Sequence, residues 1–535
     1  MRISASRPCV CHLLVLVSFL LTAGISALCQ VSVTTYHYDN FRTGRNTHET
    51  ILTPLVVRQS TFGKLFSQAV DGQVYAEPLY LSNLIIPNKG VHNTLLVATE
   101  HDSVYAFDAD NNLGANASPL WQVSFINPVK GATTIPSADA GTKMIYPEIG
   151  ITGTPVIDRT NGTIYVVAAT KENGVYFQRL HALDVTTGAE KFGGPVVIQA
   201  TVSGTGSGSS NGMITFDALR ENQRPALLLL NGVVYIAWAS HGLEKQFTYH
   251  GWVIGYSEST LMQVAAFIDT PNGAQGGIWQ SGGGPAADRL GNIFFMAGNG
   301  TFDANNGGSD YGMSYVKLAT AARLSVADYF TPYDEATLSA SDTDLGSGGA
   351  VLLPYQLGAT HPYLAIGAGK NGVIYLLDRT NMGHFNSSGN QQIVQSITNA
   401  FAGHALYSTP AYWHGQMYFW ADNDVLRIFG MSNGLLSTSP TATSTVSLAS
   451  GATPVVSSYD STNGIVWAIQ ADQAGTGGAA VLHALDASTA VELYNSSQAG
   501  SRDTAGPAVK FTVPTVVNGK VYVGTANQVD VYGPF

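Results

Sequence analysis

The residues that could do chemistry are scattered along this 535-residue chain rather than gathered in one motif. The sequence contains no strand-to-helix nucleophile elbow, no HExxH zinc motif and no phosphate-binding loop. Its three cysteines, Cys9, Cys11 and Cys29, all lie near the N-terminus, and no CxxCH motif could attach a haem. Any site must therefore be assembled from residues that are distant in sequence.

Several polar side chains stand beside predicted turns and could belong to such a site: His101, Glu172, Asn299, Asp342, Asp344 and Lys370. Each position also suits an ordinary turn or surface residue. Asn299 lies between two glycines, and Glu172 and Lys370 each precede an Asn-Gly pair of the kind found at hairpin tips. Trp279 equally suits a buried position between sheets. The choice between these roles depends on the elements that position the residues.

A sequence repeat identifies those elements. A glycine followed by β-branched and aromatic residues recurs at Gly162, Gly232, Gly291, Gly415, Gly464 and Gly519, as expected for a turn that leads into a strand. A proline-containing apolar strand precedes it, as at Thr154-Pro-Val-Ile157. A strand that ends in aspartate follows it, at Asp108, Asp184, Asp378 and Asp486. A fourth strand completes each unit.

The repeat predicts an all-β fold, an eight-bladed β-propeller of four-stranded antiparallel blades over residues 30–535. Units begin near residues 76, 150, 223, 278, 344, 404, 451 and 510. The last unit has sequence for only three strands, and residues 63–70 resemble the missing outer strand. We expect this N-terminal strand to complete the last blade and close the ring. Seven blades stay an alternative, because the third and fourth units are the least regular.

The first 29 residues read as a signal peptide, with Arg2 and Arg7 before an apolar run. We expect export to a periplasm or the cell exterior, with cleavage after Ala27 or Cys29. A lipid anchor at Cys29 is disfavoured because Leu28 precedes it. No later stretch is suited to crossing a membrane. The formal net charge of −11 disfavours nucleic acid and anionic lipid as partners.

Five phrases in chain order carry a family resemblance: Thr170-Lys-Glu-Asn-Gly-Val175, Gly276-Gly-Ile-Trp-Gln-Ser281, Ile293-Phe-Phe-Met-Ala-Gly-Asn-Gly300, Ser341-Asp-Thr-Asp-Leu345 and Gly369-Lys-Asn-Gly-Val373. Together they resemble the quinoprotein dehydrogenases, eight-bladed propellers that hold pyrroloquinoline quinone (PQQ) and calcium. The resemblance implies that Trp279 supports the quinone ring. It further implies that Glu172, Asn299 and Asp344 bind calcium, that Asp344 or Asp342 is the catalytic base, and that Lys370 contacts the quinone oxygens.

The implied function is oxidation of an alcohol or sugar. Calcium would polarise the quinone, the aspartate would take the hydroxyl proton, and Lys370 would stabilise developing charge. The chain departs from the alcohol-oxidising members because it cannot form their disulfide of adjacent cysteines. The phrase at His101 resembles instead the histidine that covers the quinone in sugar-oxidising members. Without a haem motif, electrons would pass to a separate acceptor.

Two other functions stay open. The tryptophan-docking phrase expected in each blade is mostly eroded, with Trp121 the clearest survivor, which favours a catalytically silent propeller that serves as a binding or assembly module. A glycoside hydrolase would need two carboxylates that face each other across the channel, and the sequence does not pair them. Convergence of the five family-like residues in one cavity would favour the dehydrogenase.

Overall fold

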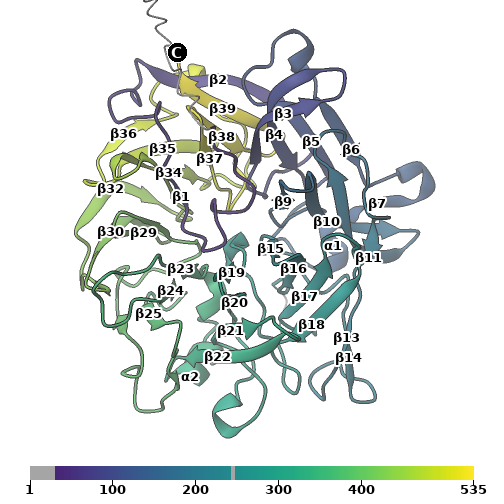
Figure 1. Cartoon of the computed structure of the whole chain (residues 1–535), viewed down its shortest axis with the longest axis vertical. Coiled ribbons are helices and arrows are strands. Elements are labelled where there is room, and N and C mark those ends of the chain that lie inside the picture. The colour runs from purple at the N-terminus through teal and green to yellow at the C-terminus, as the bar shows by residue number, and fades with distance from the viewer. Residues whose placement is uncertain (1–29, 243–247) are drawn as a thin grey trace, which may run out of the picture. The chain divides into compact units, whose positions relative to one another are not determined.

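The predicted repeats fold into β-sheets arranged around one axis (Figure 1). The computed structural model describes residues 30–242 and 248–535, so the predicted signal peptide lies outside the described residues. Within the described residues, eight blades follow one another along the chain, which confirms the eight-bladed propeller and excludes the seven-bladed alternative. In the first seven blades the four repeat strands follow one another outwards from the axis in chain order; in the last blade β37 lies nearest the axis and the N-terminal β2 is outermost.

The strands of the first four blades are β3–β6 (Leu79–Ile86, Gly90–Ala98, Ser103–Asp108, Trp121–Ser124); β9–β12 (Val156–Asp158, Thr163–Glu172, Val175–Asp184, Val196–Val197); β15–β18 (Leu228–Leu230, Val233–Trp238, Trp252–Ser257, Gln263–Ile268); and β19–β22 (Ala286–Ala287, Asn292–Met296, Tyr315–Ala319, Ser325–Thr331). Additional strands are β7 (Ala132–Pro136) and β8 (Glu148–Ile149), which extend the second blade, the hairpin β13–β14 (Thr201–Ser203, Met213–Thr215), and β26 (His384–Phe385) on the fourth blade.

The other four blades contain β23, β24, β25 and β27 (Val351–Leu352, Leu364–Ala368, Ile374–Asp378, Gln395–Ile397); β28–β30 and β32 (Ala411–Trp413, Gln416–Trp420, Asp424–Ser432, Ala442–Leu448), with β31 (Leu435–Leu436); β33–β36 (Val455–Tyr459, Thr462–Gln470, Val481–Asp486, Glu492–Asn495), with β1 (Arg45–Asn46); and β37–β39 (Thr515–Val517, Lys520–Gly524, Gln528–Pro534), with β2 (Phe62–Ala69). Helices are α1 (Ser137–Ala140) and α2 (Glu335–Ala340), and 3₁₀ turns are η1 (Gly114–Ala117), η2 (Pro128–Lys130), η3 (Gln280–Gly282), η4 (Ala304–Asn306), η5 (Leu345–Ser347) and η6 (Gly500–Arg502).

The core lies between the blades. Every neighbouring pair of blades shares a cluster of buried apolar side chains, including the pair formed by the first and last blades. Because a strand presents alternate side chains to opposite faces of its sheet, the apolar, β-branched strands of the repeat can pack against both neighbours. The ring is therefore held by face-to-face packing of sheets.

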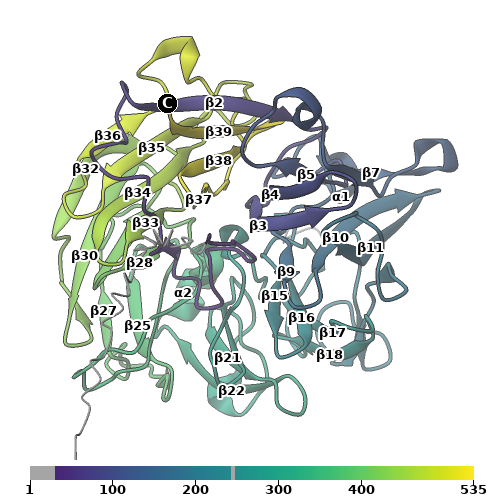
Figure 2. The same ribbon diagram turned by 45° about the horizontal axis from the view of Figure 1, so that its top comes forward.

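The last blade is completed by the N-terminal strand β2, as the sequence predicted. Strand β2 pairs antiparallel with β39, with Phe62 opposite Pro534 and Ala69 opposite Gln528. Figures 1 and 2 show the purple β2 lying along the yellow β39. This pairing covers the outer edge of β39 with a strand from the N-terminal part of the chain and so closes the ring.

Residues 31–49, here called the N-terminal arm, run once around the channel and hydrogen-bond to all eight blades. The arm-to-blade pairs are Val33 with Tyr80, Thr34 with Ile157, Asn40 with Leu229 and with Ala287, Phe41 with Leu352, Thr43 with Tyr412, Gly44 with Val456, and Asn46 with Val516. Arg42 is 0% exposed and donates to Thr35 Oγ1 and to the carbonyl oxygens of Tyr36, Leu227 and Pro285. The sequence analysis did not predict this arm.

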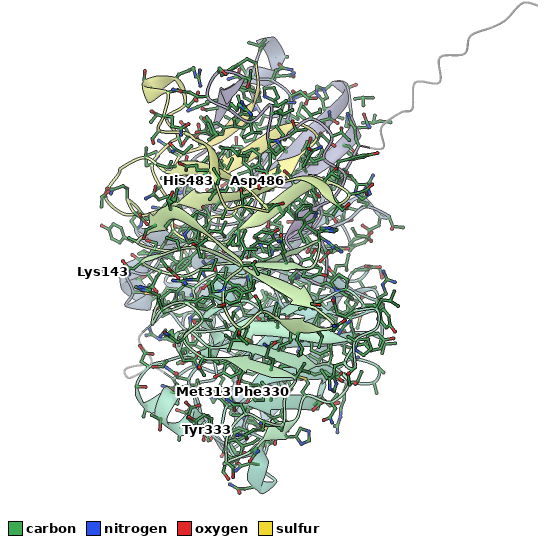
Figure 3. All side chains as sticks on the ribbon, turned by 90° about the vertical axis from the view of Figure 1, so that its left-hand side faces the viewer. Lys143, Met313, Phe330, Tyr333, His483 and Asp486 are labelled. Atoms are coloured by element: carbon green, nitrogen blue, oxygen red, sulfur yellow. The ribbon has the colours of Figure 1, made fainter. Side chains whose placement is uncertain are left out.

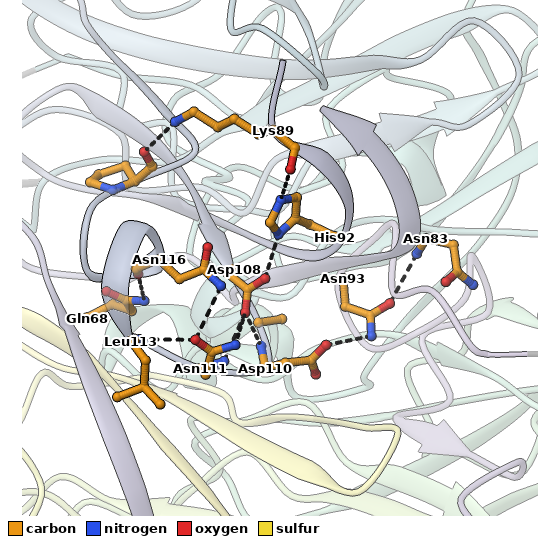
Figure 4. A network of polar contacts seen from close by, with 12 residues as sticks. Gln68, Asn83, Lys89, His92, Asn93, Asp108, Asp110, Asn111, Leu113 and Asn116 are labelled. Atoms are coloured by element: carbon orange, nitrogen blue, oxygen red, sulfur yellow. Dashed lines mark hydrogen bonds and ion pairs between the residues drawn. The ribbon is translucent and has the colours of Figure 1, made fainter. Parts of the chain in front are cut away.

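The aspartates at the ends of the third strands are turn caps. Asp108 accepts hydrogen bonds from the backbone N–H groups of Asp110 and Asn111 and pairs with His92 (Figure 4). Asp486 similarly caps the turn after β35, where Figure 3 labels it near His483. The predicted role of aspartate in ending these strands is thus confirmed at the level of hydrogen bonds.

Within the described residues, no helix combines the length and apolar composition that a membrane crossing needs.

We predict that Glu77, which holds the arm, makes stability depend on pH. Its Oε2 accepts the N–H of His37 at 2.9 Å, and burial raises the pKa of this carboxyl from 4.5 to about 8. At pH values below both the unfolded and the folded pKa of Glu77, its contribution to the free energy of unfolding is fully present. Between them the folded state binds a proton that the unfolded chain lacks, so the free energy of unfolding falls as pH rises through this window. Urea midpoints of the wild type should fall more steeply between about pH 5 and about pH 8.5 than those of Glu77→Gln. Parallel curves for the two proteins would contradict this.

Candidate functional site

A cavity of about 240 Å³ opens at one mouth of the channel. Its lining comes from segments that precede the innermost strands and from loops between second and third strands, which lie at the same end of antiparallel blades. We call it the channel-mouth cavity. Its lining residues are Tyr75, Met144, Ile145, Asn222, Arg224, Ser240, His241, Gly242, Trp279, Ser281, Asp342, Asp344, Ser347, Lys370, Tyr407 and Phe511.

Trp279 forms part of the cavity wall, and its ring packs against the backbone at Gly277 and Gly298. The indole Nε1 donates to Ser240 O at 3.2 Å, and the ring makes an edge contact with Tyr249. A Cβ on Gly298 would lie 2.5 Å from Trp279 Cζ3 and 2.6 Å from Asp344 Oδ1. Position 298 therefore requires glycine because the ring and the carboxylate both pack against it.

Asp344, Lys370, Asp342 and Asn299 form one polar cluster at the cavity. Asp344 is 5% exposed; its Oδ1 accepts the Asn299 N–H at 2.7 Å and its Oδ2 lies 2.5 Å from Lys370 Nζ. Asp342 Oδ1 accepts from Asn299 Nδ2 at 2.8 Å and from Lys370 Nζ at 3.2 Å. Burial alone would lower the pKa of Lys370, but the two carboxylates outweigh it and raise that pKa. The cluster thus holds the Lys370 ammonium beside two carboxyl groups.

Arg224, which precedes the innermost strand of the third blade, supplies a second cation to the cavity. It is 6% exposed and lies over the rings of Tyr75 and Phe511, at 5.7 Å and 4.9 Å from their centroids. Burial lowers its pKa, and no carboxylate oxygen of the described residues forms a salt bridge with it; its Nη2 has no hydrogen-bond partner among them. Glu100 acts on Arg224 electrostatically from beyond salt-bridge distance. A buried guanidinium that no carboxylate contacts is costly, and an anionic ligand would relieve that cost.

The cavity is closed towards the other mouth by the N-terminal arm. Along the third blade the chain passes from Arg224 in the cavity to Leu227, whose carbonyl accepts from Arg42. Along the sixth it passes from Tyr407 in the cavity to Thr409, which accepts from Tyr36. Because the arm fills the channel at this level, the site is a blind pocket.

The structure brings together four of the family-like residues. Trp279, Asp344 and Lys370 line the cavity, and Asn299 bonds both aspartates. Glu172 does not join them: it ends β10, and its carboxylate is paired across the hairpin with Arg179 of β11. His101 also lies outside the lining and is paired with Glu148, between Nδ1 and Oε1 at 3.0 Å.

The oxygens present do not fit a calcium ion. Calcium takes about six to eight oxygen ligands, and among the described residues no cluster of three or more His, Cys, Asp or Glu side chains could hold a metal. Asn299 Oδ1 is buried without a partner, but the neighbouring Asp344 is already neutralised by Lys370. An ammonium at that position would repel a divalent cation. We therefore derive no step through calcium.

Sequence reasoning missed Arg224, His241, Tyr407 and Phe511 as lining residues. None of them stands in a recognisable motif. A usable signal existed, however: Tyr75, Arg224, Trp279, Asp344, Tyr407 and Phe511 all lie within a few residues of the predicted unit starts. In a propeller these segments meet at one mouth, so the unit boundaries themselves point to the lining.

Comparison with solved structures agrees with this geometry. A europium-containing methanol dehydrogenase superposes with a TM-score of 0.62 at 14% identity, covering 94% of this chain and 98% of that one. Quinohemoprotein alcohol dehydrogenases from Comamonas testosteroni and Pseudomonas putida give TM-scores of 0.59 and 0.58 at 14% identity, each covering 94% of this chain and 80% of theirs. The fold is that of a quinoprotein-dehydrogenase-like β-propeller.

No protein-family model matches this propeller, and no curated protein matches it in sequence. At this level of identity the solved structures establish the shared architecture only. The function of this quinoprotein-dehydrogenase-like propeller must therefore be argued from its own residues.

We predict that Gly298→Ala disrupts the channel-mouth cavity without unfolding the ring. The added methyl group must displace the Trp279 ring or the Asp344 carboxylate, at a cost of about 1–3 kcal/mol. Tryptophan fluorescence should change, and the denaturation midpoint should fall. Gly430→Ala is the matched control, because its Cβ would meet only a Thr441 methyl group at 3.2 Å. Equal effects of the two substitutions would show that Gly298 has no special packing role.

Proposed function

We propose that this chain is an exported PQQ-type dehydrogenase that binds a flat anionic quinone in the channel-mouth cavity and oxidises an alcohol or sugar there. The observation that carries the proposal is Arg224, a buried cation with an unpartnered Nη2 and no carboxylate of the described residues within salt-bridge distance, in the same aromatic-walled cavity as Trp279 and Lys370. PQQ is a planar aromatic molecule that bears carboxylates. Its shape and charge match a pocket with ring walls and two cations.

The chain's own residues divide the work as follows. Trp279 and Phe511 offer flat apolar surfaces, and Arg224 offers guanidinium N–H groups to a carboxylate. When bound, the quinone would accept the hydride equivalent from the substrate. Asp344 is the group that can take the hydroxyl proton, and its Oδ2 is ion-paired with Lys370 Nζ. Lys370 can then turn towards negative charge that develops nearby.

An adjoining chamber of about 220 Å³ shares Tyr407 and Phe511 with the channel-mouth cavity and is also lined by Asp422 and Lys510. It leaves room for a small alcohol or sugar beside a bound quinone. The export part of the proposal rests on the first 29 residues, and the absence of a CxxCH motif implies a separate electron acceptor.

A second candidate is a catalytically silent propeller that binds an anionic ligand or assembles with a partner. The observation that favours it is the enclosure of Asp344, whose two carboxylate oxygens are both occupied, by Asn299 N and by Lys370 Nζ. The position of Glu172 outside the site points the same way. Turnover separates this candidate from the enzyme.

Titration of the purified protein with PQQ, followed by tryptophan fluorescence, tests the binding site. We expect a dissociation constant in the micromolar range or below, that is, about −8 kcal/mol or stronger. Arg224→Met should weaken binding at least tenfold and Arg224→Lys less, since both cations complement a carboxylate but only arginine does so in a bidentate manner. Arg323→Met, an exposed arginine in a turn, is the control. Thermal melts of each variant confirm folding.

Dye reduction with a panel of alcohols and aldoses then tests catalysis by the PQQ-loaded protein. Asp344→Asn should abolish turnover while PQQ affinity stays within about threefold. PQQ binding without turnover in the wild type would favour the silent propeller. Failure of the wild type to bind PQQ, or equal binding by Arg224→Met, would reject the proposed site. A chelator should change PQQ affinity by less than about twofold, because the described residues assemble no calcium site.

A further inference from the structure

A larger cavity of about 930 Å³ lies at the other mouth of the channel. Its lining includes arm residues from Asp39 to Arg45, the turn after the innermost strand of the fourth blade, and the segment after the innermost strand of the fifth. Those turns lie at the end of the blades opposite the channel-mouth cavity. The arm, with the buried Arg42, separates the two cavities. We call this second one the opposite-mouth cavity.

Four cations line the opposite-mouth cavity: Arg45, Arg289, Lys317 and Arg379. No carboxylate oxygen of the residues the structure describes lies within 4.0 Å of the charged nitrogens of any of them. Lys317 Nζ donates to Arg379 O, and Arg379 lies over the rings of Phe41 and Tyr363. These contacts hold Lys317 and Arg379 in place, and Asp288 acts electrostatically on Arg379 from beyond salt-bridge distance, in a chain whose net charge is −11.

The two carboxylates of the lining are engaged locally. Asp39 accepts from the N–H and Oγ1 of Thr43. Asp288 caps its own turn by accepting from the N–H groups of Leu290 and Asn292. With these satisfied, the lining carries two more positive than negative charges and presents a net positive field to a ligand.

Aromatic rings give the cavity a flat apolar surface beside those charges. Tyr355 is 57% exposed and Tyr363 44% exposed, and their rings meet edge to face at 5.3 Å. Rings exposed in this way are suited to stack on a planar ring or on the face of a sugar. The volume is that of a small-molecule site, and the acidic chain disfavours a large polyanion.

We propose that the opposite-mouth cavity is a second binding site, for a small organic acid that carries carboxylates on a ring. The ring lies on Tyr355 and Tyr363, and the carboxylates meet Arg289 and the other three cations. Two sources share this chemistry, a uronate oligosaccharide and an aromatic polycarboxylate. The proposal does not rest on the proposed dehydrogenase activity, because the two cavities share no lining residue.

Isothermal titration of the full-length mature protein with trigalacturonate, trimesate and neutral maltotriose tests this site. We expect at least one acid to bind with a dissociation constant below about 1 mM, more weakly at high ionic strength, and maltotriose to bind at least tenfold more weakly. Binding of either acid supports the proposal and identifies its source.

Substitutions test whether the acids bind in the opposite-mouth cavity. Arg289→Glu should weaken it at least tenfold and Tyr355→Ala at least threefold. Arg159→Glu is the matched control: Arg159 follows Asp158 in the second blade's turn as Arg289 follows Asp288 in the fourth, and it is exposed but lines neither cavity. Trp279→Leu should leave binding unchanged. No binding of either acid, equal loss in Arg159→Glu, or loss in Trp279→Leu would overturn the proposal.

Discussion

Ring closure is the constraint on which the rest of this structure depends. The outer strand of the last blade, β2, comes from the beginning of the described chain, so the outer edge of β39 stays unpaired until both ends meet. The arm then crosses every blade in chain order, from Val33 at the first to Asn46 at the eighth. Each contact is a backbone or short side-chain hydrogen bond, modest alone. Together they fix the spacing of eight sheets around one axis.

Both cavities follow from that closure. Segments before the innermost strands can face one another only when the blades circle a common axis, and they then place Arg224, Trp279 and Asp344 around one pocket. The arm divides the channel into two blind ends with different chemistry. At the channel-mouth cavity, Lys370 is ion-paired with carboxylates, whereas the buried Arg224 contacts no carboxylate of the described residues. At the opposite-mouth cavity, none of the four cations forms a salt bridge with a carboxylate of the described residues.

The sequence predicted the architecture well because the repeat is local. Glycine turns, apolar strands and capping aspartates such as Asp108 lie within one blade, and their spacing is visible without tertiary information. The candidate site was predictable only in part. Trp279, Asp344 and Lys370 lie in family-like phrases and do line the cavity. Glu172 also lies in such a phrase, but it forms an ion pair with Arg179 across the β10–β11 hairpin and does not line the cavity. Arg224 and Phe511 carry no local motif. The arm has no periodicity, because it bonds to one blade after another and to itself only in isolated turns.

Hydrogen exchange measured by mass spectrometry on the purified protein tests the central claim most directly. If the arm and β2 close the ring, peptides covering residues 33–46 and 62–69 should be protected as strongly as those of β37–β39, and should open together with them. Rapid exchange of residues 33–46 while the blades stay protected would show that the arm is a loose tail. The account of two separate blind cavities would then be contradicted.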